Sequence, residues 1–132
     1  MKIIRSQMPT SKGSPEWFTG DVYVDSIAVE GSGMNAAVVH FTPAARTAWH
    51  RHPLGQTIYI LEGEGRVQRE GGHVELVRAG DVVFFEPGEN HWHGAAPNRF
   101  MAHVAMLRLP ESGPGTDWGT LVTDEEYLGR PT

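Results

Sequence analysis

Two stretches of the sequence share one pattern: TAWHRHPLGQ at residues 47–56 and GDVVFFEPGENHWHGA at residues 80–95. Each contains two histidines separated by one residue, together with short apolar runs and the turn formers Pro and Gly. Residues two apart in a β-strand point to the same face, so each histidine pair can direct two imidazoles into one interior. Both stretches therefore favour short strands joined by turns.

The rest of the chain repeats this alternation of apolar runs and turns. Its 132 residues are enough for one domain with one core, and its 16 Gly and 9 Pro suit many short strands better than a helical bundle. A hairpin turn is expected at residues 70–73. We predict an all-β sandwich or barrel with strands at Val22–Val29, Ala36–Thr42, Gln56–Leu61, Gly65–Arg69, Val74–Val77, Val82–Glu86, His91–Ala95 and Met101–Leu109, and turns between them, including one at 62–65.

The two ends of the chain differ from this centre. We expect one domain over residues 1–132, with a barrel core at about 21–109, an N-terminal arm at 1–20 and a C-terminal tail at 110–132. In the tail, Thr123 and Glu126 have the spacing of a capping box, which predicts a short helix through Leu128 that ends at Gly129. Trp118 is predicted to hold this helix against the barrel.

Composition limits the classes of function. The absence of Cys excludes disulfides, thiolate metal sites and cysteine nucleophiles. A net charge of −5, with no cluster of Lys and Arg, argues against nucleic acid as a partner. No apolar run reaches the roughly 20 residues that a membrane span needs, and Arg5 comes too early for a signal peptide. We expect a cytoplasmic protein that neither spans nor binds a membrane.

The spacing of the histidines points to a metal. Imidazole is the commonest neutral metal ligand, and two pairs spaced i, i+2 favour a shared site over four separate hydrogen-bonding roles. Gln56 is expected on the same strand face as Ile58 and Ile60, although it could equally be a polar residue that opens an edge strand. His103 lies on an apolar strand and can be a core residue or a site residue. Two further histidines are expected to be inert, His40 pointing outward and His73 in solvent.

Residues 43–56 with Gly63 resemble the first motif of the cupin superfamily, and residues 80–91 resemble the second. The resemblance implies a double-stranded β-helix, or jelly-roll barrel, with metal ligands at His50, His52, Gln56 and His91. Four residues depart from the usual motifs: Ala44 replaces a glycine, Glu86 a proline, Ala95 an asparagine, and Gln56 the usual glutamate.

Longer segments resemble the small bacterial cupins with manganese-dependent hydroxynitrile lyase activity, namely WFTG at 17–20, ARTAWH at 45–50, HPLGQ at 52–56 and HWHGAAP at 91–97. This resemblance implies one divalent ion, preferably Mn2+, with Fe2+, Ni2+ and Zn2+ as alternatives. It also implies a cyanohydrin as the small-molecule substrate. His93 and His103, with Thr47, would stand beside the ion, one imidazole acting as base and the other on cyanide.

Two other functions stay open. One is a cupin dioxygenase that uses Fe(II) on the same ligands; the neutral amide of Gln56 argues against it, because a more positive site resists losing an electron. The other is a non-catalytic cupin that binds a small ligand. In each case we expect a homodimer or larger homo-oligomer, since Trp17, Phe18, Trp49 and Trp92 supply more aromatic surface than one small core absorbs. Ala37, Val39 and Leu107 are expected to make the pocket apolar.

Overall fold

The computed structural model describes residues 1–6 and 8–129, and these form strands and one short helix, α1 (Asp124–Tyr127). No helix in the described ranges has the length and apolar character that crossing a membrane requires. The all-β prediction is confirmed. The strands are β1 (Ser11–Lys12), β2 (Phe18–Thr19), β3 (Val22–Ser26), β4 (Met34–Phe41), β5 (Arg46–Thr47), β6 (His50–Arg51), β7 (Gln56–Arg69), β8 (Glu75–Arg78), β9 (Val82–Phe85), β10 (His91–Ala95), β11 (Met101–Arg108) and β12 (Asp117–Trp118).

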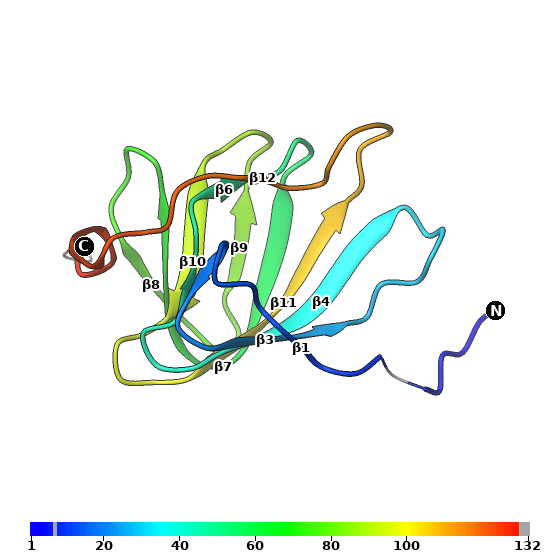
Figure 1. The fold of residues 1–132 in the computed structure, drawn as a ribbon, viewed down its shortest axis with the longest axis horizontal. Coiled ribbons are helices and arrows are strands. Elements are labelled where there is room, and N and C mark those ends of the chain that lie inside the picture. The colour runs from blue at the N-terminus through cyan, green and yellow to red at the C-terminus, as the bar shows by residue number, and fades with distance from the viewer. Residues whose placement is uncertain (7, 130–132) are drawn as a thin grey trace.

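The strands form two sheets that share β7 and curl around a common interior (Figure 1). Sheet A has the order β1-β3-β4-β11-β7-β9, and sheet B contains β8, β7, β10, β5 and β2, with β6 and β12 at its end. Every pairing is antiparallel. Residues 11–19 of the N-terminal arm join both sheets, because β1 pairs with β3 and β2 pairs with β5.

Strand β7 corrects one prediction. Residues 56–61 and 65–69 were expected as two strands with a turn at 62–65, but they are a single strand of 14 residues. Gly63 lets the strand turn from sheet A into sheet B: its φ is +79°, and a Cβ there would lie 1.8 Å from the carbonyl oxygen of Phe100. The glycine therefore marks a bend within a strand and not its end.

The core lies between the two sheets. Strand alternation directs one side chain in two inward, which is why the apolar residues of each strand meet here. The fully buried members include Phe41, Ile58, Ile60 and Met101, and Phe85 is 3% exposed. The same alternation brings His91, His93 and His103 inside, so the polar site is built into the core.

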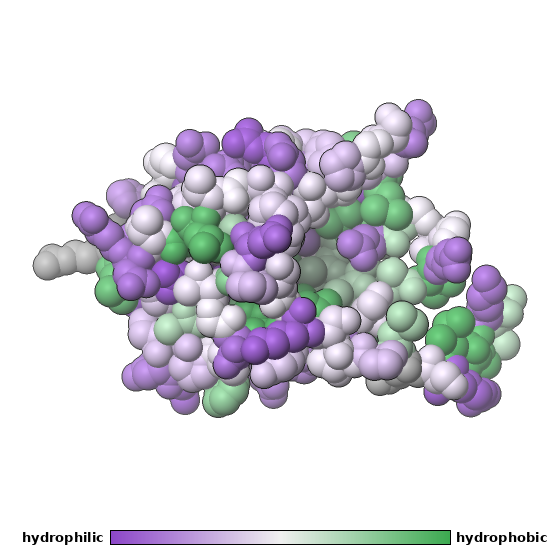
Figure 2. Space-filling model, in the orientation of Figure 1, coloured by the Kyte–Doolittle hydropathy of each residue, from purple (hydrophilic) through white to green (hydrophobic). Residues whose placement is uncertain are grey.

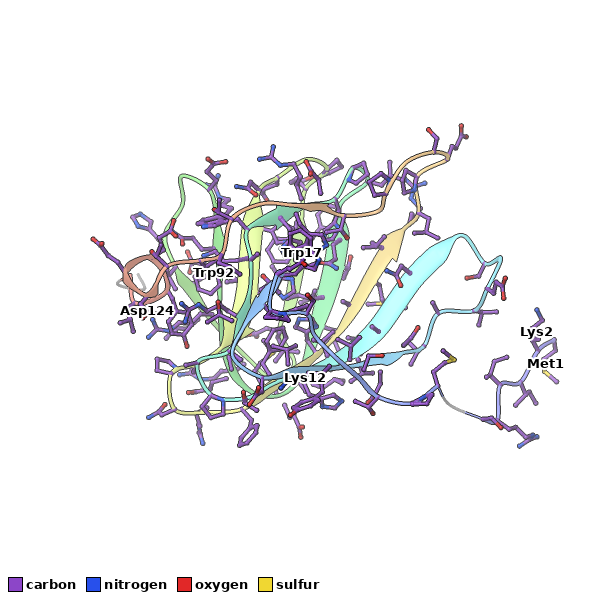
Figure 3. The ribbon with its side chains drawn as sticks, viewed as in Figure 1. Met1, Lys2, Lys12, Trp17, Trp92 and Asp124 are labelled. Atoms are coloured by element: carbon purple, nitrogen blue, oxygen red, sulfur yellow. The ribbon has the colours of Figure 1, made fainter. Side chains whose placement is uncertain are left out.

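The C-terminal helix begins as predicted. Thr123 accepts a hydrogen bond from the backbone of Glu126, and the Glu126 carboxylate accepts one from the backbone of Thr123. Tyr127 then fixes the helix to the outer face of sheet B, where it donates to the carbonyl of Ala95 and lies 5.7 Å from the Trp92 ring. Figure 3 shows Trp92 close to the helix that carries Asp124.

Trp118 has a different place from the one predicted. It does not hold the helix; its ring stacks on Trp17 at 5.3 Å and lies 4.8 Å from the ring of His50. The reason is β12, which pairs with β6 and carries the tail across the open end of the barrel. We call residues 109–119 the strap; Figure 3 shows Trp17 directly under it.

Three of the four aromatic residues expected at a dimer interface are used inside the chain. Trp92 is fully buried beside Tyr127, and Trp17 and Phe18 pack on Trp118. Trp49 is half-buried, and its indole donates to the Glu126 carboxylate. These contacts leave less aromatic surface for an oligomer interface than the sequence suggested, with Trp17, Phe18 and Trp49 half-buried and Trp92 fully buried.

Ala44, one of the departures from the usual motifs, has a φ of +68°. An L-residue in this left-handed region is strained by about 1–2 kcal/mol, whereas glycine is not. A glycine is therefore usual at this position because of the backbone conformation. This chain adopts the same conformation with an alanine.

Candidate metal centre

Three imidazoles meet at the open end of the barrel. His50 lies in β6 directly opposite His91 in β10, and their ring centroids are 4.3 Å apart. His52 follows β6, with its centroid 5.0 Å from that of His50 and 5.4 Å from that of His91. All three are buried, with exposed fractions of 0–3%.

Each of these rings is held in the same way. Its Nδ1 lies within hydrogen-bond distance of a backbone carbonyl, and since a carbonyl oxygen only accepts, Nδ1 carries the proton and donates. Nε2 is then left with its lone pair, the state in which imidazole binds a metal. The acceptors are the carbonyls of Ala48 for His50 at 2.8 Å, of Gly115 for His52 at 2.9 Å and of Glu89 for His91 at 2.8 Å.

The donor set fits a divalent ion. Nε2 of His52, Nε2 of His91 and Oε1 of Gln56 are buried and have no hydrogen-bond partner. Buried polar atoms without a partner are costly and rare, so three at one end of the barrel call for a ligand. Nitrogen and neutral oxygen donors suit Mn2+, Fe2+, Ni2+ or Zn2+. The ligand atoms that lie within 4.8 Å of one another are those of His50, His91 and His93, and His52 is not in this group. Nε2 of His93 is likewise buried without a hydrogen-bond partner.

Burial keeps these rings neutral. It lowers the pKa of His91 to about 3, lowers that of His50 well below its ordinary value, and lowers that of His52 less. A neutral ring at pH 7 offers its lone pair without first losing a proton.

A second group of side chains lies next to the three rings. His93 Nδ1 and His103 Nε2 are 2.9 Å apart, which makes one of them the donor and the other the acceptor. Neither His93 Nε2 nor His103 Nδ1 has a hydrogen-bond partner in the part of the chain that the structure describes, so nothing there fixes which ring donates. Thr47 accepts a hydrogen bond from the backbone N–H of His93 at 3.2 Å. Burial lowers the pKa of His103 to about 4 and, together with the nearby His103, lowers that of His93 well below its usual range.

Except for His91, the side chains of both groups line one cavity of about 140 Å3, and the His91 ring lies beside it, 4.3 Å from the ring of His50. This volume is less than half that of a typical pocket for a drug-sized ligand, so the cavity suits a small molecule. On the side shown in Figure 2 the molecule is hollowed between the strap and β4, with pale and green, apolar residues around the hollow. The lining includes His50, His52, Gln56, His93, His103 and Thr47, with apolar walls from Phe18, Val39, Phe41, Ala105, Leu107 and Trp118.

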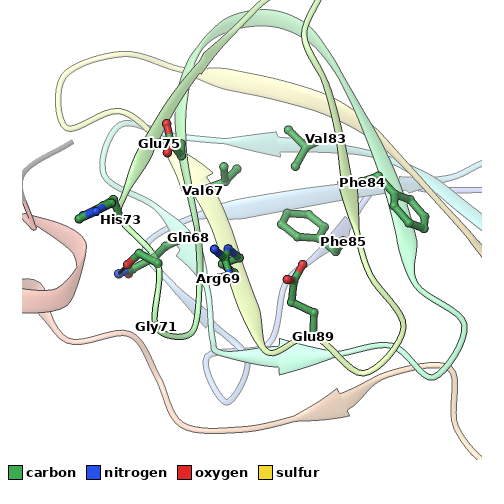
Figure 4. Close-up of a pocket in the computed structure, with 11 residues that line it drawn as sticks. Val67, Gln68, Arg69, Gly71, His73, Glu75, Val83, Phe84, Phe85 and Glu89 are labelled. Atoms are coloured by element: carbon green, nitrogen blue, oxygen red, sulfur yellow. Dashed lines mark hydrogen bonds between the residues drawn. The ribbon is translucent and has the colours of Figure 1, made fainter. Parts of the chain in front are cut away.

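A larger groove of about 320 Å3 lies elsewhere and does not include this chemistry. It runs between the β7–β8 hairpin and β9, with Arg69 and Glu89 on either side of the ring of Phe85 and Phe84 farther away (Figure 4). Phe85 also stacks on His91, with centroids 3.7 Å apart and an angle of 9° between the rings. The ring of Phe85 thus separates the groove from the candidate centre. None of the four expected ligands lines the groove.

The structure brings together all seven site residues that the sequence singled out. Val39 and Leu107 line the cavity as expected, whereas Ala37 packs against the core cluster. His40 does point outward, but it is paired with Asp25 at 3.1 Å, and His73 is exposed.

Sequence reasoning missed the strap. Gly115 holds His52, and Thr116 and Trp118 line the cavity. A glycine and a threonine in a polar tail carry no spacing signal, so only the fold could place them here.

The match to a family model covers residues 37–106, more than half of the chain, and the family is the cupin domain. This chain belongs to the cupin family.

Within that family, it is 50% identical over 129 residues to an (R)-mandelonitrile lyase of Granulicella tundricola, a match that covers 96% of this chain and 97% of that protein. Among solved structures it is similar to a cupin-like protein of Thermotoga maritima, with 36% identity, a TM-score of 0.84 and coverage of 96% and 95% of the two chains. A predicted oxalate decarboxylase of the same organism has 24% identity and a TM-score of 0.71 over 83% of this chain and all of that one, a likeness of fold.

Proposed function

We propose that this protein is a metal-dependent lyase that cleaves and forms small cyanohydrins. The observation that carries the proposal is the division of the buried histidines into two groups in and beside one small cavity. Three rings have their free Nε2 fixed by the backbone, and two others are bonded to each other. The (R)-mandelonitrile lyase that is 50% identical to this chain supports the choice of reaction.

The residues that would hold the ion are His50, His52, Gln56 and His91. We propose Mn2+, with Fe2+, Ni2+ or Zn2+ taking the site according to supply, because affinity rises along the Irving–Williams series regardless of biological choice. When bound, the ion supplies a Lewis acid that makes a substrate hydroxyl more acidic.

His93 and His103 would move the proton. If His93 Nδ1 donates to His103, then His93 has a bare Nε2 and can accept the hydroxyl proton; if His103 donates, His93 Nε2 carries a proton and can give it. As the carbon–carbon bond breaks, its electron pair leaves with cyanide and the hydroxyl oxygen becomes the carbonyl. Delivery of the proton to cyanide returns the pair to its neutral state.

The cavity wall would select the substrate. Val39, Leu107 and Phe18 line it with apolar surface, and Thr47 adds a hydroxyl that can face a polar group. A small volume and apolar walls suit the cyanohydrin of a small aromatic or aliphatic aldehyde.

We also propose where the chain acts and in what form. The chain would act as a single domain in the cytoplasm, consistent with the absence of Cys, and as a homodimer. With a net charge of −5, its partner would be its substrate and not nucleic acid.

The test combines metal analysis of natively purified protein with cyanide release from mandelonitrile. We expect about one ion per chain and release that stops when a chelator removes the ion. Oxygen uptake with phenolic substrates, without cyanide release, would indicate the Fe(II) dioxygenase instead. No release with any of the four metals would leave a metal-binding cupin and refute the lyase.

A further inference from the structure

A second hollow adjoins the cavity of the candidate centre. The loop between β3 and β4 and the start of the strap lie on the same side of the barrel (Figure 1). They are joined there, because the backbone N–H of Leu109 donates to the carbonyl of Gly33 at 2.8 Å. Beside this joint is a hollow of about 590 Å3, which we call the β3–β4 groove. Its apolar walls come from Ala28, Val29, Met34 and Leu109.

The β3–β4 groove and the cavity meet at Asn35 of β4, which lines both. Leu107 and Leu109 are two residues apart and point to the same face, and Leu107 lines the cavity whereas Leu109 lines the groove. A Cβ on Gly115 would lie 3.3 Å from Leu109 and 3.4 Å from Leu107, so both side chains reach the same part of the strap. An apolar wall therefore runs from the cavity into the groove.

The register of sheet A gives the distance from the expected ligands to this meeting point. Leu107 lies opposite Asn35, and Met106 lies opposite Thr57. Gln56, Leu107 and Asn35 are therefore level on three neighbouring strands, and two strand spacings of about 4.8 Å separate the first from the last. At about 1.2 Å per bond, an extended chain crosses this distance in about eight bonds. A ring attached directly to the reacting carbon stays in the cavity, and a long chain reaches the groove.

We propose that the β3–β4 groove binds the alkyl chain of long, straight-chain aliphatic cyanohydrins and of the aldehydes that they release. The cavity of about 140 Å3 is smaller than a typical ligand site of roughly 300–1,000 Å3, and the cavity together with the groove falls within that range. Charge favours a neutral chain, because Glu30 also lines the groove and would repel a chain that ends in a carboxylate. The inference rests on the proposed function, since the hydroxyl end of the chain has to bind at the candidate centre.

A pair of substrates tests the groove. The cyanohydrins of butanal and decanal differ by six methylene groups, and the longer chain extends past Asn35. We expect KM for the decanal cyanohydrin to be roughly 30-fold lower, because each methylene group that leaves water strengthens binding by up to about fourfold.

Two variants place a charge against the chain. Val29→Asp and Met34→Asp should each raise KM for the decanal cyanohydrin roughly tenfold and leave KM for the butanal cyanohydrin unchanged. Val29 is 37% exposed and Met34 43%, so the fold tolerates a polar side chain at either position, and circular dichroism checks this. Leu76→Asp is the matched control, because Leu76 is 50% exposed but lies in β8 of sheet B, and it should change neither KM.

Binding of 1-decanol separates the groove from the reaction, because this alcohol has no cyanide to release. Calorimetry should show that the wild type and Leu76→Asp bind 1-decanol more tightly than 1-butanol, and that Val29→Asp loses most of this difference. Tighter binding of 1-decanol without cyanide release from any cyanohydrin would support the groove and refute the lyase. Equal binding of the two alcohols by the wild type, or equal losses in Val29→Asp and Leu76→Asp, would overturn the groove. Cyanide release from the butanal cyanohydrin with no gain for the longer chain would overturn the groove and leave the lyase intact.

Discussion

His50, His52 and His91 differ from His93 and His103 in what holds their second nitrogen. In the first group a backbone carbonyl fixes Nδ1 as a donor, and the ring cannot exchange its tautomer while the fold is intact. In the second group each ring holds the other, so both tautomers satisfy the same contact. A fixed lone pair suits a metal ligand, whereas an exchangeable proton suits an acid or base. The difference lies in the hydrogen-bond partners, since all five rings are buried alike.

Removing a ring of the first group should have the largest effect. We expect His91→Ala to lose most of the bound metal and all measurable cyanide release, because one of four donors is gone. Elemental analysis after native purification measures the first, and a cyanide assay the second. His73→Ala, which removes an exposed histidine, is the control and should change neither. Full metal content in His91→Ala would remove His91 from the ligand set.

Removing a ring of the second group should separate the two properties. We expect His103→Gln to keep its metal and to lose activity by about 10²–10⁴-fold, the usual contribution of a general acid or base. Glutamine fills much of the space of the buried ring, so packing is disturbed less than by alanine. If metal and activity fell together, the second group would not be distinct from the first.

The shared burial of the five rings predicts a pH dependence of the metal-free protein. Burial lowers the pKa of His103 from 6.5 to about 4, so below pH 6.5 the unfolded chain binds more protons than the folded one. Above pH 6.5 the ring is neutral in both states and protonation costs the folded state nothing. As the pH falls to 4, proton binding by the unfolded chain lowers the free energy of unfolding by roughly 3 kcal/mol for His103. Thermal melting of metal-free protein should show the decline, and His103→Gln should show a smaller one. An equal decline in that variant would contradict the assignment.

The smallest effect concerns the neutral donor of the first group. We expect Gln56→Glu to bind the metal roughly tenfold more tightly, because an added negative charge raises the affinity of an oxygen site. Competition with a chelator measures this. Asn35→Asp places a carboxylate elsewhere on the cavity lining and should have a much weaker effect. If both variants bound the metal equally more tightly, the gain in affinity would come from negative charge in the cavity, and Gln56 would not be a ligand.

Much of this arrangement could be predicted from the sequence, because it depends on the spacing of residues that are close together along the chain. The i, i+2 spacing of His50 with His52 and of His91 with His93 requires only strand alternation, and the capping box of Thr123 and Glu126 requires only one turn of helix. What could not be predicted depends on distant contacts. Gly63 looks like a turn residue until Phe100 lies against it, and Trp118 has no sequence signal for the open end of the barrel.

The division of the histidines was likewise beyond the sequence. The spacing of His93 and His103 does not predict that their rings meet, since the nine residues between them lead from sheet B to sheet A. The holding of His52 by Gly115 spans 63 residues. Such pairings become visible only once the sheets are closed.

The contact between Gly115 and His52 also sets the order in which the centre is made. During synthesis His50, His52 and His91 leave the ribosome before the strap does, because the strap follows them in the chain. Until residue 115 arrives, His52 has no carbonyl to fix its tautomer, and Trp118 does not yet cover His50. All four expected ligands thus precede the strap residues that contact His52 and His50. A ribosome that stops short of the strap, or a protease that trims the tail, leaves a chain that carries all four expected ligands, but His52 lacks its Gly115 partner and His50 lacks the cover of Trp118.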